Sequence, residues 1–132
     1  MIQFSIVLLA ALGAANATEP DTAPRKTSSI GYASVAEALS DLKANPENSV
    51  RVQEGWTIID DRKNSAIWSF SPEGHPAYPA AVKRTILERD GHIYVDMKAL
   101  CQAKKEPCDD LIEQFKALNE QMRQHMQQQA GG

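Results

Sequence analysis

The first clear pattern in the chain is a helical stripe that begins after Ser34. Apolar residues recur there at helical spacing, at Val35, Ala38, Leu39 and Leu42. Ser34 and Glu37 have the spacing of a capping box, in which two side chains satisfy backbone N–H groups at the start of a helix. Asn45-Pro46 ends the stripe. We therefore predict a short amphipathic helix whose apolar face covers a sheet.

From Ser49 onward the apolar period becomes two, which is typical of β-strands. Residues 49–59 form the first predicted strand, and we interpret Gly55 within it as a bulge or kink. A second strand follows at residues 66–71. The charged segment 60–64 between them predicts an antiparallel hairpin, because a short polar turn is the simplest connection.

Two further strands, residues 82–89 and 92–98, flank Asp90-Gly91. This dipeptide is typical of a type I′ hairpin turn, which needs positive φ at both central residues. The turn sets the register of the hairpin and places Ile86 opposite Val95. Both faces of this hairpin are partly apolar, so we expect each face to be covered by a helix.

The last pattern is a long helical stripe after Pro107, a residue that suits the start of a helix. Its apolar members are Cys108, Leu111, Ile112, Phe115, Leu118, Met122 and Met126. One small sheet does not need so long a stripe, and the surplus around Met122 and Met126 predicts a homodimer contact. The alternative is that these methionines complete the core or lie scattered on the surface.

These elements predict an α+β fold: an N-terminal helix, a four-stranded antiparallel meander, and a long C-terminal helix pinned by a disulfide. We place a single domain at residues 30–126. A polar segment without apolar periodicity, residues 18–29, is predicted to be a flexible leader, and residues 127–132 a disordered tail.

Residues 1–17 have the features of a signal peptide: a short apolar run followed by Ala15-Asn16-Ala17, the small-x-small pattern of a cleavage site. The alternative is a retained anchor, but the apolar run is shorter than the roughly 20 residues that span a bilayer. We therefore expect a periplasmic or secreted protein, with no membrane span after cleavage. An even pair of cysteines in an exported chain, Cys101 and Cys108, predicts a structural disulfide.

Charge and composition exclude some classes of function. The formal net charge is −3 and no basic run is interleaved with aromatic residues, so nucleic acid is a poor candidate ligand. The sequence has no nucleophile elbow and no cofactor motif, and both cysteines are assigned to the disulfide. Its three histidines, His75, His92 and His125, lie in different predicted elements. We predict no metal site and no cofactor.

The best candidate for a binding site is the proline-rich loop after the second strand. Pro76 and Pro79 restrict the backbone, and a polyproline II conformation would project His75 and Tyr78 from one side of the loop. Lys83 and Arg84 follow directly, so we assign His75, Tyr78, Lys83 and Arg84 to one binding surface. The alternative is that Tyr78 and the prolines close the end of the sheet while Lys83 and Arg84 are solvated.

Two functions fit this constellation. The first is a binding module that uses the loop at residues 75–79 to engage another envelope protein or a peptide, because a stiff loop loses little entropy on binding. The second is a small envelope-modifying hydrolase with His75 as general base. The lack of a paired nucleophile favours the binding module.

Three segments carry a resemblance to known proteins: residues 68–84, the Asp90-Gly91 hairpin, and residues 100–108. Together they resemble a group of small secreted or periplasmic proteins of Gram-negative bacteria, of the pseudomonad type, that have no assigned activity. The resemblance covers roughly residues 34–122. It implies an exported α+β protein and brings no catalytic residues. The order of elements is also similar, more weakly, to periplasmic inhibitor modules of the PepSY type.

Overall fold

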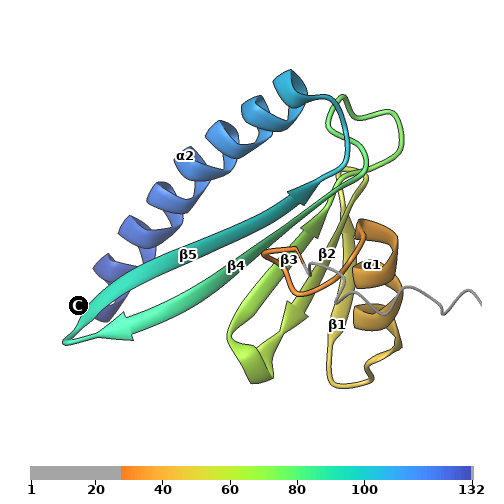
Figure 1. Cartoon of the computed structure of the whole chain (residues 1–132). Coiled ribbons are helices and arrows are strands. Elements are labelled where there is room, and N and C mark those ends of the chain that lie inside the picture. The colour runs from red at the N-terminus through yellow and green to blue at the C-terminus, as the bar shows by residue number, and fades with distance from the viewer. Residues whose placement is uncertain (1–27, 132) are drawn as a thin grey trace, which may run out of the picture.

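The computed structural model describes residues 28–131, and all structural statements below refer to this part of the chain. The predicted signal peptide and residues 18–27 of the predicted leader lie outside the described residues. Two helices, five strands and one short 3-10 helix follow one another along the chain (Figure 1). They are α1 (Val35–Ala44), β1 (Ser49–Gln53), β2 (Trp56–Asp61), η1 (Arg62–Asn64), β3 (Ala66–Phe70), β4 (Ala80–Arg89), β5 (His92–Cys101) and α2 (Lys105–Ala130).

The predicted α+β class is confirmed, but the sheet has five strands and not four. The strands follow in the order β1-β2-β3-β4-β5, and every neighbouring pair is antiparallel. The interpretation of Gly55 as a bulge or kink within one strand is wrong. Glu54 and Gly55 have φ of 52° and 83°, so they form a two-residue turn that divides the predicted first strand into β1 and β2.

The hairpin of β4 and β5 has the predicted register. Ile86 pairs with Val95, and the turn residues Asp90 and Gly91 have φ of 52° and 79°. Both strands are ten residues long, so this hairpin extends well beyond the shorter β1, β2 and β3 (Figure 1). The long hairpin is the part of the sheet along which α2 lies.

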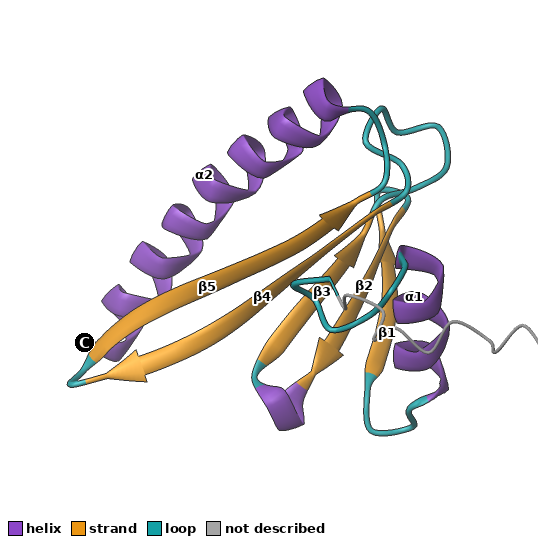
Figure 2. Cartoon of the chain, in the orientation of Figure 1, coloured by secondary structure: helices purple, strands orange, loops and turns teal. Residues whose placement is uncertain are grey.

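The helices cover opposite faces of the sheet (Figure 2). One core contains Val35, Ala38 and Leu42 of α1 with Ile59, Trp68, Phe70 and Ala81 of the strands. The other contains Leu111 and Phe115 of α2 with Ala80 and Val82 of β4. Because side chains alternate along a strand, neighbouring residues such as Ala81 and Val82 enter different cores.

α1 begins as the capping pattern predicts. The Ser34 Oγ accepts a hydrogen bond from the Glu37 backbone N–H at 3.1 Å. The return bond is shifted by one residue, since Glu37 Oε2 accepts from the backbone N–H of Ala33 at 3.3 Å. The side chain of Gln102 satisfies a further backbone donor, the N–H of Val35, at 3.1 Å. The start of the helix is therefore tied to the chain just after β5.

The predicted disulfide is present. Cys101 at the end of β5 and Cys108 in the first turns of α2 are bonded, with their Cα atoms 5.8 Å apart. Because the loop between them is short, the disulfide sets the point at which α2 leaves the sheet. It thereby determines which strands the helix covers and which it leaves open.

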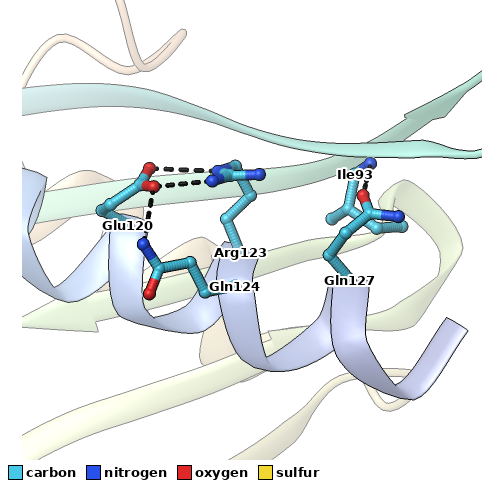
Figure 3. A network of polar contacts seen from close by, with 5 residues as sticks. All are labelled: Ile93, Glu120, Arg123, Gln124 and Gln127. Carbon is cyan, nitrogen blue, oxygen red and sulfur yellow. Dashed lines mark hydrogen bonds and ion pairs between the residues drawn. The ribbon is translucent and has the colours of Figure 1, made fainter. Parts of the chain in front are cut away.

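The predicted disordered tail needs correction, because α2 continues to Ala130. The side chain of Gln127 reaches the tip of the long hairpin, where its Oε1 accepts a hydrogen bond from the Ile93 N–H at 2.8 Å (Figure 3). Its Nε2 donates to the Gly91 carbonyl at 3.0 Å. Two turns earlier, Glu120 accepts hydrogen bonds from Arg123 and Gln124 (Figure 3). A polar sequence can thus remain helical when its side chains bond to the backbone and to each other.

The apolar residues toward the end of α2 are only partly exposed to solvent. Met122 and Met126 are half-buried, and Met126 lines a shallow hollow with Ile67 and Ile86 of the sheet. Leu118 is more open, with 48% of its surface exposed. Part of the stripe therefore faces the sheet of its own chain, and the homodimer contact stays a prediction.

Candidate functional site

A groove lies between α2 and the part of the sheet that α2 leaves open. Its volume is about 450 Å³. We call it the sheet–helix groove and define it by its lining residues: Arg51, Gln53, Glu54, Trp56, Ile58, Ser69, His75, Arg84, Gln114, Phe115 and Leu118. A neighbouring hollow of about 480 Å³ shares His75 and Gln114 with it and continues along the start of α2.

The floor of the groove comes from three adjacent strands. Arg51 of β1 pairs with Ile58 of β2, and Ile58 pairs with Ser69 of β3, so these side chains form a row across one face of the sheet. Their sequence neighbours, such as Ile59 and Trp68, point to the opposite face and pack beneath α1. The floor therefore has a polar residue on β1, Arg51, an apolar residue on β2, Ile58, and a polar residue on β3, Ser69.

Aromatic side chains form the walls. The Trp56 ring lies against His75 from the loop, with centroids 5.2 Å apart, and against Phe115 from α2, with centroids 5.8 Å apart. Leu118 adds an exposed aliphatic side chain one turn further along α2. Three separate elements thus contribute apolar surface to one concave site.

Arg84 is the unusual residue of the groove. Its guanidinium carbon lies 5.2 Å from the centre of the Phe115 ring, and its Nε is buried without a hydrogen-bond partner. Within residues 28–131 no carboxylate forms an ion pair with it. Burial, and secondly the charge of Arg51, lower the pKa of Arg84. The guanidinium of Arg84 is therefore partly desolvated and makes no ion pair with any residue of 28–131, although Glu54 also lines the groove.

The other polar groups of the floor differ from Arg84. Arg51 lies at the exposed edge and is balanced by Asp60, with Nη1 and Oδ2 2.5 Å apart. Ser69 is only 1% exposed, and its Oγ has no partner among the described residues. A buried polar atom without a partner is uncommon and costs free energy. Two such atoms, on Ser69 and Arg84, lie next to the same groove.

The structure brings together two of the four predicted site residues. His75 and Arg84 both line the groove. Lys83 lies on the other face of the sheet, with its Nζ 5.3 Å from the centre of the Trp68 ring. Tyr78 is 44% exposed and does not line the groove. Strand alternation explains the separation of Lys83 from Arg84, because adjacent residues of a strand point to opposite faces.

The loop itself does not have the predicted polyproline II conformation. It consists of two successive turns, in which the His75 N–H donates to the Pro72 carbonyl at 3.1 Å and the Tyr78 N–H donates to the His75 carbonyl at 2.9 Å. The Tyr78-Pro79 peptide bond is cis. Polyproline II has no internal hydrogen bonds, whereas Gly74, with φ of 85°, allows the chain to turn and close them.

A backbone hydrogen bond orients the imidazole of His75. Its Nδ1 lies 3.0 Å from the backbone N–H of Ala77 and accepts that hydrogen bond. In the neutral ring the proton then resides on Nε2. His75 is therefore arranged as a hydrogen-bond donor at the mouth of the groove, next to Trp56.

Sequence reasoning missed Arg51, Trp56, Ser69 and Phe115 as site residues. Trp56 and Ile58 alternate as groove-facing residues in β2, and this period was visible in the sequence. The error at Gly55 hid it, because merging β1 with β2 removed the strand pairing that places Arg51 beside Ile58. The apolar periodicity places Phe115 on a helix, but nothing in the sequence indicates which strands that helix faces.

The unbalanced charge leads to a prediction about stability. Replacing Arg84 by Met keeps an unbranched side chain and removes a desolvated charge, so Arg84→Met is expected to raise the free energy of unfolding by about 1 kcal/mol. Lys83→Met is the matched control on the same strand. It loses the contact with the Trp68 ring and is expected to lower the free energy of unfolding by about 0.5–1 kcal/mol.

Urea denaturation of both variants checks this prediction. Opposite signs for the two neighbouring positions are the expected result. A clear loss of stability in Arg84→Met would mean that Arg84 is a satisfied structural residue and would contradict its assignment to the site.

Residues 28–131 lack two further features, a cluster of metal ligands and a membrane-spanning helix. No group of three or more His, Cys, Asp or Glu side chains there is placed to hold a metal ion. Neither helix of residues 28–131 combines the length and apolar character needed to cross a membrane. Comparison with protein-family models, with curated proteins and with solved structures finds no match to the chain.

Proposed function

We propose that this protein is a periplasmic or secreted binding module, and that its ligand occupies the sheet–helix groove with the loop at residues 72–79 at its mouth. The signal-peptide pattern of residues 1–17 supports export. A disulfide between Cys101 and Cys108 is consistent with an oxidising compartment.

The observation that carries the proposal is the state of Arg84. A guanidinium that is partly desolvated, placed against an aromatic ring and without an ion pair to any described residue lowers the stability of the protein in the absence of a ligand. Binding sites often retain such groups because a ligand supplies the missing partner. Ser69 adds a second unsatisfied polar atom beside the same groove.

A hydrolase with His75 as general base has less support. The Nδ1 lone pair of His75 is occupied by the Ala77 N–H, and in this tautomer Nε2 holds a proton. The hydroxyl of Ser69 has no hydrogen bond to any described residue, so no base activates it. The binding function therefore accounts for more of the geometry than catalysis does.

Filling the groove tests the proposed function. Gln114 lies on α2 at the groove and is exposed, so Gln114→Trp is expected to fill the groove without disturbing a core. Ala117→Trp is the matched control, since Ala117 is an exposed residue of α2 that does not line the groove. The mature protein and both variants are purified from a bacterial periplasm, and native mass spectrometry identifies any bound molecule.

We expect the wild type and Ala117→Trp to retain the same molecule and Gln114→Trp to lose it. A molecule retained equally by all three proteins would place the ligand elsewhere. If none of the three carries a bound molecule, and none takes one up from an envelope extract, the proposed function is wrong.

A further inference from the structure

We propose that the ligand of the sheet–helix groove is an anionic amphiphile, a molecule with a carboxylate or phosphate group and an apolar chain or ring. This inference rests on the proposed binding function and adds the chemistry of the ligand. It follows from the positions of charge and apolar surface within one groove.

The anionic group is assigned to Arg84. A planar guanidinium forms two parallel hydrogen bonds with a carboxylate or phosphate, and it is the preferred partner for such groups at partly buried sites. The Arg84 side chain makes no ion pair within residues 28–131, so these donors are not in use. The contact with Phe115 holds the guanidinium at one side of the groove.

Nearby groups reinforce the choice of an anion. Arg51 adds a second positive charge to the lining, and it is this charge that contributes to the lowered pKa of Arg84. Because Arg51 is already paired with Asp60, an anion bound at Arg84 would chiefly balance the charge of Arg84 itself. Glu54 is the acidic residue of the lining, and it lies in the turn between β1 and β2. A cationic ligand would be repelled by the positive charge of Arg84.

The apolar part of the ligand is assigned to the walls. Trp56, Phe115 and Leu118 come from β2 and α2 and offer aromatic and aliphatic surface on either side of Ile58. A volume of about 450 Å³ lies within the range of small-molecule sites, which is roughly 300–1,000 Å³. The groove is partly open to solvent, which suits a chain whose far end remains outside.

The test uses probes that vary the charge of the headgroup and the presence of an alkyl chain independently. Decanoate and decyl phosphate carry the two candidate anionic groups, decyltrimethylammonium carries the same chain with a positive charge, and acetate carries the carboxylate alone. Each probe is titrated below its micelle concentration into the mature, oxidised protein. Trp56 fluorescence reports occupation of the groove, and Trp56→Phe identifies the signal, because Trp68 lies on the opposite face of the sheet.

We expect at least one of the two anionic probes to bind, with decyltrimethylammonium at least about tenfold weaker and acetate showing no saturable binding. Tighter binding of decanoate assigns a fatty-acid type of ligand, and tighter binding of decyl phosphate assigns a phosphate headgroup. Arg84→Met is expected to weaken the better anionic probe at least about tenfold, whereas Lys83→Met changes its affinity less than about twofold.

Three results would overturn the inference: equal affinity for the cationic and anionic probes, unchanged affinity in a folded Arg84→Met variant, or no binding of either anionic probe. The comparison of probe charges uses the wild type, so it does not depend on the folding of a variant. If the probes fail while Gln114→Trp still abolishes a co-purified molecule, the groove binds a ligand of another class and only the anionic assignment fails.

Discussion

Trp68→Ala is expected to lower the free energy of unfolding by about 3–5 kcal/mol, the range for truncating a buried Trp or Phe. Trp68 is 2% exposed and lies at the centre of the core beneath α1. Its ring stacks on Phe70 with centroids 6.2 Å apart and makes a T-shaped contact with Tyr32 with centroids 5.9 Å apart. Truncation therefore leaves a large cavity between α1 and the sheet.

Trp68→Phe is the matched control. The indole Nε1 of Trp68 is buried without a partner, so a Phe ring loses some packing but also removes an unsatisfied donor. We expect it to cost less than about 1.5 kcal/mol. Chemical denaturation followed by circular dichroism measures both variants. If Trp68→Ala costs less than Trp68→Phe, the packing of α1 on this face of the sheet is not what stabilises the fold.

Removal of the disulfide is expected to have the second largest effect. Cys101 and Cys108 close a loop with a sequence separation of 7, and the chain-entropy relation assigns such a loop about 2–3 kcal/mol. Cys101→Ala/Cys108→Ala is therefore expected to lower the free energy of unfolding by about that amount. Urea denaturation compares this variant with the oxidised wild type.

The disulfide also has an expected effect on the groove. It fixes the start of α2, and Gln114, Phe115 and Leu118 of that helix form one wall. Loss of the bond is therefore expected to weaken ligand binding beyond the effect of unfolding, measured at a temperature where both proteins are folded. Unchanged stability in the double variant would show that packing of Leu111 and Phe115 alone positions the helix.

The balance of charge around Arg84 connects stability with binding. Functional sites commonly show a trade-off in which a variant gains stability without ligand and loses affinity for the ligand. Arg84→Met is expected to behave in this way. Lys83→Met, one residue away on the other face, is expected to show neither gain in stability nor loss of binding.

Local chemistry accounts for the elements that could be predicted. The capping residues of α1, the Asp90-Gly91 turn and the cysteine pair each act over a few residues, and the structure confirms all three. The missed turn at Glu54-Gly55 shows the limit of this approach. A glycine inside an alternating pattern fits a bulge and a tight turn equally well until the pairing of the flanking strands is known.

The site was predicted less well than the fold, for a reason visible at Lys83 and Arg84. Their adjacency in the sequence led us to group them, although strand alternation sends them to opposite faces. His75 lines the groove, but its prediction as a binding residue rested on a backbone conformation that the loop does not adopt. Only the position of α2 reveals that Phe115 meets Trp56 and Arg84.

The sequence by itself determined the α+β class, the two helices, the long hairpin with its register, and the disulfide, because periodicity, capping and turn chemistry operate within a few residues. The tertiary structure alone decided that Arg51, Ser69, Arg84 and Phe115 share one groove. These residues come from four elements far apart in the chain. The strand order and the path of α2 across the sheet decide whether a charged side chain such as Arg84 has an ion-pair partner nearby.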